Sequence, residues 1–266
     1  MSLMRQDDRT TTLGRSFGSV AEGYDRYRPG PPDVALDWLL PEDTRDVIEL
    51  GAGTGALTRL LVARGLSVRA IEPDARMRQV LSDRVPGVEA LEGTAEAIPA
   101  GDGSADVVIA ASAWHWVDEA RAVPEVARVL RPGGRLALLW SGTDRRLPWL
   151  RALWAGGRAL DDDQAEVLDA SRRHRRAVDL GSSTAFGEPE RHLIEWDMTM
   201  SRDELIGLVG TYSAVIVMDP DERRVFDLAV ESFLDTDADT AGRDSFEVPM
   251  RCLCWRVDRM DVPDPI

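Results

Sequence analysis

The sequence predicts an α/β fold with a doubly wound, mostly parallel sheet of seven strands. Three observations support this prediction. Short β-rich runs alternate with segments of helical periodicity between residues 46 and 140. The run ADVVIAAS at 105–112 is apolar almost throughout, as in a strand that is covered on both faces. The first strand ends in a glycine-rich segment, ELGAGTGALT at 49–58, that leads directly into a helix.

The elements of the first half follow one another through short turns. Apolar and β-branched runs predict strands, and apolar side chains at helical spacing predict the helices between them. The strands are expected at 46–50, 67–72, 88–93, 105–112 and 135–140, and the helices at 55–65, 74–85 and 119–130. Pro132 and the two glycines after it are expected to end the last of these helices.

The pattern changes after residue 140. One or two helices are expected at 145–180, inserted between the fifth strand and a sixth at 191–200. Ser201 with Glu204 predicts a capping box at the start of a helix over 202–215. A helix at 221–234 and a seventh strand at 246–257 complete the chain. We expect one domain over residues 1–266, with a core at 15–142, a helical cap at 145–180 and a carboxyl-terminal part at 190–258.

Composition limits the classes of function. The formal net charge of −15 argues against nucleic-acid binding, which depends on Lys and Arg that neutralise phosphates. No apolar run approaches the ~18 residues of a membrane span, and the polar amino terminus does not resemble a signal peptide. A cytoplasmic protein is expected. Cys252 and Cys254 are expected to be reduced thiols in the core, and no metal-ligand spacing indicates a metal site.

The glycines at 51, 53 and 55 predict a ligand site. They let the backbone approach a ligand, and the helix that follows presents free N–H groups. Glu72 closes the second strand 21 residues after Gly51, the spacing expected of an acid that hydrogen-bonds ribose hydroxyls. The ligand is therefore expected to carry a ribose. The glycine spacing also satisfies the fingerprint for nicotinamide dinucleotides. This motif alone therefore does not decide between a nicotinamide dinucleotide and another cofactor that carries a ribose.

Four segments occur together in one order: ELGAGTGALT at 49–58, AIEPDARM at 70–77, GTAEAIPAGDGSADVV at 93–108 and EVARVLRPGGRLAL at 125–138. Together they resemble class I S-adenosylmethionine-dependent methyltransferases of the small-molecule, type 11-like branch. The resemblance covers residues 15–142. It implies a Rossmann-like methyltransferase fold with an amino-terminal lid helix, S-adenosylmethionine as cofactor and a small-molecule substrate. Methyl transfer to a hydroxyl or carboxylate oxygen is favoured over transfer to nitrogen or carbon.

The resemblance implies a cofactor-binding role for each matching residue. Glu49 would lie near the ammonium of the cofactor, and Glu72 would bind the ribose diol. The methionine portion would lie on Gly51, Ala52, Gly53, Thr54 and Gly55. The adenine would contact Pro73, Met77, Thr94, Ala95 and Glu96. Met77 could instead be plain helix core, and Glu96 a capping or surface acid. Ala111 and Ser112, at the end of the fourth strand, complete the set.

The segment ASAWHWVD at 111–118 leaves the fourth strand at the edge where open α/β sheets bind ligands. Trp114 and Trp116 are candidate substrate-binding residues, because their rings exclude water and offer π faces to a cation. His115 is the candidate catalytic base, because its unperturbed pKa lies near neutrality. The alternative is that all three side chains pack under the following helix.

The segment AEGYDRYRPGPP at 21–32 precedes the first strand. Tyr24 and Tyr27 are three residues apart and share a helix face. The resemblance implies that this helix covers the cofactor, with both tyrosines at the cleft and Arg28 paired with a substrate carboxylate. Alternatively, the tyrosines anchor the helix and Arg28 caps it.

Two further functions remain open: an S-adenosylmethionine-binding protein without catalysis, and a nicotinamide-dependent reductase. Glu49 disfavours the reductase, because a carboxylate just before the turn would oppose a pyrophosphate. A cofactor with an ammonium, a sulfonium and no phosphate suits an acid at this position. No sequence pattern identifies the substrate or the oligomeric state.

Overall fold

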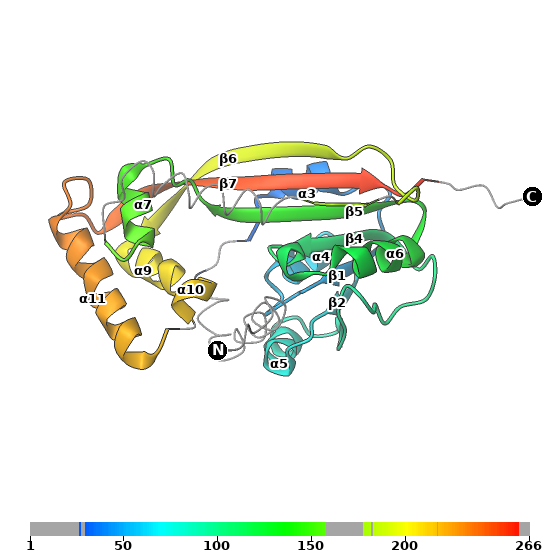
Figure 1. Cartoon of the computed structure of the whole chain (residues 1–266), viewed down its shortest axis with the longest axis horizontal. Helices are drawn as coiled ribbons and strands as arrows, with labels where there is room; N and C mark the ends of the chain where they lie inside the picture. Colours follow the sequence, from blue (N-terminus) through cyan, green and yellow to red (C-terminus); the bar gives the residue numbers. More distant parts are fainter. Residues whose placement is uncertain (1–26, 28–29, 158–177, 182, 217, 261–266) are drawn as a thin grey trace, which may run out of the picture. The chain divides into compact units, whose positions relative to one another are not determined.

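The computed structural model describes residue 27 and residues 30–157, 178–181, 183–216 and 218–260. Strands and helices alternate along the first half of the chain, except that the fourth strand follows the third without a helix between them (Figure 1). The strands are β1 (Asp46–Leu50), β2 (Ser67–Ile71), β3 (Glu89–Leu91), β4 (Ala105–Ala111), β5 (Leu130–Thr143), β6 (Glu190–Ser201) and β7 (Ser245–Asp258). The helices are α3 (Asp33–Leu39), α4 (Ala56–Ala63), α5 (Ala75–Arg84), the 3-10 helix η2 (Trp114–Trp116), α6 (Glu119–Val129), α7 (Pro148–Trp154), α9 (Arg202–Gly210), α10 (Ser213–Ile216) and α11 (Pro220–Thr236).

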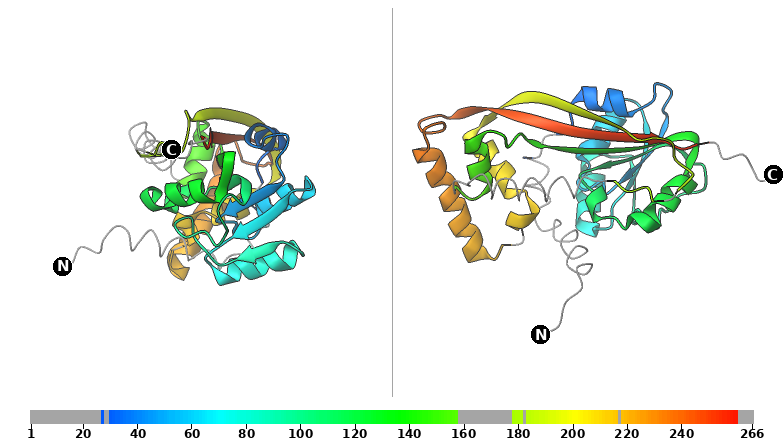
Figure 2. Two further views of the ribbon diagram at one scale, coloured as in Figure 1. Left: turned by 90° about the vertical axis from the view of Figure 1, so that its right-hand side faces the viewer. Right: turned by 45° about the horizontal axis from the view of Figure 1, so that its top comes forward.

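The strands form one seven-stranded sheet in the order β3-β2-β1-β4-β5-β7-β6. The pairs β1–β2, β1–β4, β2–β3 and β4–β5 are parallel. β7 runs antiparallel to β6, because Glu190 pairs with Arg256 whereas Thr199, later in β6, bonds to Glu247, earlier in β7. β5, β7 and β6 lie side by side as long neighbouring strands (Figure 2). The doubly wound, mostly parallel sheet predicted from the sequence is confirmed.

The chain divides into two compact units. The first, called here the sheet unit, contains residues 29–141, 178–194 and 252–266. The second, called the helical unit, contains residues 1–28, 142–177 and 195–251. β5, β6 and β7 each contribute residues to both units. All candidate site residues from Glu49 to Trp116 lie in the sheet unit. Of the predicted cap, residues 145–157 and 178–180 are described, and they contain the helix α7.

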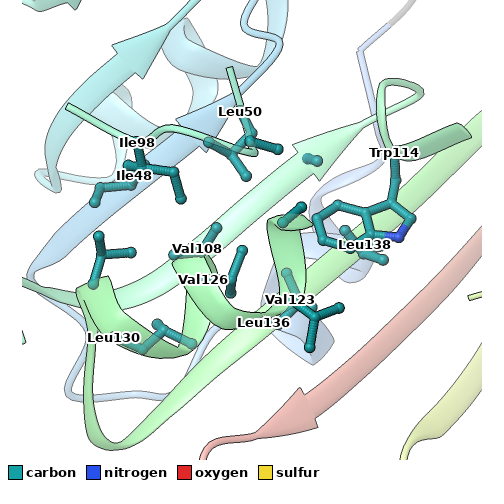
Figure 3. Close-up of a cluster of buried hydrophobic side chains, with 14 of the residues drawn as sticks. Ile48, Leu50, Ile98, Val108, Trp114, Val123, Val126, Leu130, Leu136 and Leu138 are labelled. Atoms are coloured by element: carbon teal, nitrogen blue, oxygen red, sulfur yellow. The ribbon is translucent and has the colours of Figure 1, made fainter. Parts of the chain in front are cut away.

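The two faces of β1 have different environments, because successive side chains of a strand point to opposite sides. Ile48 and Leu50 belong to a buried cluster that includes residues of α6 (Figure 3). Glu49, between them, points to the other face, where Thr58 of α4 contacts it. α6 and α4 therefore cover opposite faces of the sheet.

Some boundaries differ from the sequence predictions. β5 begins at Leu130 rather than at residue 135, so Pro132 and its glycines lie within the strand. The register shifts between Ala105 and Val107, which marks an irregularity in the pairing, and a Cβ on Gly134 would lie 2.8 Å from the carbonyl oxygen of Arg131. Glycine is therefore required there by close approach, not by a turn.

In the second half of the chain, one expectation is confirmed and another is corrected. Ser201 and Glu204 form the predicted capping box. The helix expected over 202–215 is divided, because α9 ends at Gly210 and α10 begins at Ser213. Cys252 and Cys254 are both buried and form no disulfide, and their Sγ atoms lie 3.6 Å apart. No helix in the described ranges combines the length and the apolar character needed to cross a bilayer.

Candidate cofactor and active site

The turn after β1 is built on glycines in left-handed conformations. Gly51, Gly53 and Gly55 have φ angles of 64°, 58° and 88°, a region that residues with a Cβ rarely adopt. A Cβ on Gly51 would lie 2.6 Å from the Cβ of Ala113. The N–H of Gly51 donates to the carbonyl of Ile71 at 2.8 Å. The turn is thus fixed to the end of β2 and contacts the segment that follows β4.

Glu49 is a buried carboxyl group near the end of β1. It is 2% exposed, and the hydroxyl of Thr58 donates to its Oε2 at 2.6 Å. Burial raises the pKa of Glu49 to about 8; the bond from Thr58 opposes this rise, and the charge of Glu72 adds to it. A cation beside Glu49 would stabilise its ionised form. This environment suits a positively charged ligand group.

Glu72 lies directly after β2 and supports the glycine turn. Its Oε2 accepts from the N–H of Gly53, and its Oε1 from the N–H of Asp74, each at 2.9 Å. Burial raises the pKa of Glu72, and these two hydrogen bonds oppose the rise. Each carboxylate oxygen has a second lone pair, so Glu72 keeps acceptor capacity for ribose hydroxyls.

Two residues implied for adenine binding lie near the start of α5. Met77 is 4% exposed, and its Sδ lies 4.0 Å from the position of a Cβ on Gly53. Met77 therefore packs against the glycine turn, as in the helix-core alternative. Pro73 is exposed, which leaves its ring accessible to a ligand.

The other residues implied for adenine binding follow β3. Thr94 is exposed and Ala95 is buried. Glu96 accepts a hydrogen bond through Oε1 from the N–H of Asp118 at 2.8 Å. Asp118 is the N-cap residue of α6, so this bond agrees with the capping alternative for Glu96. An adenine contact for these three residues stays a prediction.

The chain leaves β4 through a residue in an uncommon conformation. Ser112 has a φ angle of 53°, a positive value found at no other non-glycine residue in the described ranges. Such conformations persist where surrounding contacts enforce them, and they cluster at functional sites. The N–H of Ser112 donates to the carbonyl of Leu139 at 2.8 Å. Ala111 and Ser112 immediately precede Ala113, which contacts the glycine turn.

Trp114, His115 and Trp116 form the 3-10 helix η2. With three residues per turn, their side chains point about 120° apart, so they do not share one face. Trp114 is 1% exposed and packs in the cluster that includes Leu138 (Figure 3). It therefore agrees with the packing alternative and not with a substrate wall. His115 and Trp116 are partly exposed, with ring centroids 4.7 Å apart, and remain the candidates for that wall.

Among the amino-terminal candidates, Tyr24 and Arg28 lie outside the described residues. Tyr27 belongs to the helical unit, where its ring packs on α9. A Cβ on Gly207 would lie 2.5 Å from atoms of the Tyr27 ring. This contact agrees with the anchoring alternative, and a position of Tyr27 at the cleft stays a prediction.

Two features of the site were not predicted from the sequence. The first is Thr58, which donates to Glu49. In a strand–turn–helix unit the first turn of the helix lies over the end of the strand. A threonine in that turn is therefore the sequence feature that could have predicted this hydrogen bond. The second is the left-handed Ser112, for which the sequence offers no signal, since serine adopts many conformations.

The glycine turn and the acids beside it lie at the carboxyl ends of the parallel strands, the edge where open α/β sheets bind their ligands. Two buried carboxyl groups, Glu49 and Glu72, flank the glycine turn. In their ionised forms they would repel a phosphate, and they suit an ammonium and a ribose diol. These two acceptor groups fit S-adenosylmethionine, which when bound supplies an electrophilic methyl group on a sulfonium.

Comparison with known proteins agrees with this cofactor. Residues 48–138 match the family model described as methyltransferase domain. The chain is 43% identical over 244 residues to an uncharacterized methyltransferase of Mycobacterium tuberculosis, covering 92% of this chain and 96% of that protein. It is 35% identical over 220 residues to an uncharacterized methyltransferase-like protein of Schizosaccharomyces pombe, covering 79% and 82%. The chain belongs to the class I S-adenosylmethionine-dependent methyltransferases.

Solved structures show the same fold. A protein from Anaeromyxobacter dehalogenans, assigned as a type II methyltransferase, superposes with a TM-score of 0.63 at 24% identity, covering 88% of this chain and 98% of that one. The phosphoethanolamine N-methyltransferase 2 of Haemonchus contortus, in complex with S-adenosyl-L-methionine, superposes with a TM-score of 0.52 at 15% identity, covering 92% and 57%. At these identities the likeness concerns the fold alone.

Proposed function

We propose that this methyltransferase binds S-adenosylmethionine across the glycine turn and transfers its methyl group to an oxygen of a small molecule. Glu49 would pair with the ammonium of the cofactor, and Glu72 would accept from the ribose hydroxyls. The observation that carries the proposal is the buried carboxyl of Glu49, whose pKa is raised to about 8. Burial of an acid costs free energy, and a cation placed beside it offsets that cost.

A carboxylate is the acceptor we favour. A relative named malonyl-[acyl-carrier protein] O-methyltransferase, from Methylococcus capsulatus, is 36% identical over 173 residues, covering 60% of this chain and 61% of that protein. A carboxylate is already ionised at neutral pH, so placement and exclusion of water suffice for its methylation. In this reading Trp116 and His115 border the acceptor. His115 acts as a base only if the acceptor is a hydroxyl.

The two alternatives predict different ligands. A reductase would bind a nicotinamide dinucleotide, whose pyrophosphate would lie on the turn beside the two acids, an unfavourable arrangement. A protein without catalysis would bind the cofactor and release no S-adenosylhomocysteine with any acceptor. Screening metabolites, including dicarboxylic acids, for S-adenosylhomocysteine release separates the enzyme from this second alternative.

Calorimetry with S-adenosylhomocysteine tests the site. The wild-type chain should bind it, and Glu72→Ala should weaken binding by at least about tenfold, roughly 1.4 kcal/mol. Glu92→Ala is the matched control, because Glu92 is exposed and pairs with Arg78 near the same loop. Equal affinity in Glu72→Ala and in the wild type would contradict the assignment.

A further inference from the structure

The turn that carries His115 and Trp116 is fixed on two sides. On one side Ala113 contacts the glycine turn, since a Cβ on Gly51 would lie 2.6 Å from the Ala113 Cβ. On the other side the indole Nε1 of Trp114 donates to Oε1 of Glu119 at 2.6 Å. A hydrogen bond to a carboxylate is stronger than one between neutral groups. Glu119 is therefore the polar anchor of η2.

Other tryptophans of the same buried cluster differ from Trp114 in this bond. Trp140 and Trp255 belong to the cluster, and each buries its indole Nε1. Neither nitrogen has a hydrogen-bond partner among the residues that the structure describes. Within these residues, the bond to a carboxylate distinguishes Trp114 from both of the others.

Glu119 is the first residue of α6 and follows the last residue of η2, Trp116, after two residues. While Oε1 accepts from Trp114, its Oε2 accepts from the backbone N–H of Asp179 at 3.1 Å. Burial raises the pKa of Glu119, and the bonds from Trp114 and Asp179 oppose the rise. Both carboxylate oxygens are thus occupied by donors from two separate segments, so Glu119 cannot rotate without losing both.

We infer that Glu119 is a positioning residue of the active site. It fixes the ring of Trp114 and thereby the direction in which His115 and Trp116 leave η2. The three side chains share the backbone of a single 3-10 turn, so a rotation of that turn that moved Trp114 would also move the two others. The inference rests on the proposed function, in which His115 and Trp116 border the reacting groups.

The ring resonances of His115 report this positioning in the whole protein. The chain has three histidines, so carbon-13-labelled histidine gives an assignable NMR spectrum. His192, stacked on Trp38 with ring centroids 5.5 Å apart, serves as the internal reference. Trp114→Phe and Glu119→Ala should each shift or broaden the His115 resonances and leave those of His192 unchanged. The affinity for S-adenosylhomocysteine should stay within about twofold, since neither residue contacts the glycine turn.

Two variants control for the loss of packing. Trp140→Phe removes an indole N–H from the same cluster, but one that has no partner among the described residues, so it should leave the His115 resonances unchanged. Glu119→Gln keeps an acceptor oxygen for Trp114 and loses the acceptor for Asp179. Its His115 resonances should lie close to those of the wild type, which assigns the effect to the bond with Trp114.

The outcomes separate this inference from the proposed function. Unchanged His115 resonances in both Trp114→Phe and Glu119→Ala would overturn the positioning role. An equal shift in Trp140→Phe would also overturn it, because the effect would then be one of packing. In the wild type, S-adenosylhomocysteine should bind and move the His115 resonances. A wild type that binds none contradicts the proposed function, whereas one that binds it without moving His115 overturns the positioning role.

Discussion

The hydroxyl of Thr58 donates a 2.6 Å hydrogen bond to the carboxyl of Glu49, which is 2% exposed. The bond joins the first turn of α4 to the end of β1. It only partly offsets the effect of burial, which raises the pKa of Glu49 to about 8. In the ligand-free protein at neutral pH, Glu49 is therefore mostly protonated. A bound ammonium would favour its ionised form and release the proton.

Binding of S-adenosylhomocysteine should therefore depend on pH. Below the pKa of Glu49, about 8, the ligand must displace a proton, so the affinity should rise between about pH 6 and pH 7.5, by up to tenfold per pH unit. Calorimetry in buffers with different ionisation enthalpies should show release of about one proton near pH 6.5. Glu49→Gln should bind more weakly, without this dependence. An equal pH dependence in the two proteins would mean that another group titrates.

The free energy of unfolding of the ligand-free protein should also depend on the ionisation of Glu49. The pKa of Glu49 is about 8 in the folded chain against an ordinary value of 4.5, so the folded state binds the proton more tightly. The stabilisation that Glu49 contributes is complete below pH 4.5 and is lost as the pH rises through about 8. Glu49→Gln should thus gain stability relative to the wild type over this range. Denaturant unfolding at several pH values measures the difference, and a constant difference would contradict the burial argument.

Thr58→Val should lower the affinity for S-adenosylhomocysteine without changing the shape of the site. The substitution removes the hydroxyl that lowers the pKa of Glu49, so the ligand must displace a more tightly held proton. Loss of one hydrogen bond costs about 1 kcal/mol, or about fivefold in affinity for S-adenosylhomocysteine. Thr58→Ser keeps the donor and should bind like the wild type. Equal losses in the two variants would assign the effect to packing.

Gly51→Ala should abolish cofactor binding. Gly51 has a φ angle of 64°, and its Cβ would meet Ala113 at 2.6 Å. Gly65→Ala is the matched control, because Gly65 has a φ angle of 78° with nothing within 4 Å of its Cβ position. Both variants should lose about 1–2 kcal/mol of stability through the left-handed backbone. Only Gly51→Ala should lose affinity in calorimetry; a similar loss in Gly65→Ala would indicate a general effect of destabilisation.

The parallel strands and their glycine turn could be read from the sequence because the signals are local. β1 spans the predicted residues 46–50, and β4 ends one residue before the predicted limit. A buried parallel strand requires a continuous apolar run, and few other elements produce one. β5 begins earlier than predicted because Pro132 and two glycines are typical of a turn, whereas here pairing with β4 at Ala105 and Leu130 includes them in the strand. Pairing between distant residues overrides such local signals.

The site was predicted less completely than the fold. The placement of Glu49, Glu72 and the glycine turn at one edge of the sheet follows from strand order, and their roles as cofactor-binding residues stay predictions. The placement of Trp114 does not follow from strand order, because alternation along a strand would place Trp114 and Trp116 on one face, whereas η2 separates them. The hydrogen bond between Glu119 and Trp114 likewise depends on the backbone conformation at the start of α6. Such contacts are set by the path of the backbone between elements, which residue types alone do not specify.

A crystal structure of the chain with S-adenosylhomocysteine tests the central claim most directly. The account predicts the ligand's amino group within hydrogen-bond distance of the Glu49 carboxylate, about 2.7–3.2 Å, with both ribose hydroxyls on Glu72. A nucleoside bound elsewhere on the chain, or an amino group turned away from Glu49, would contradict it.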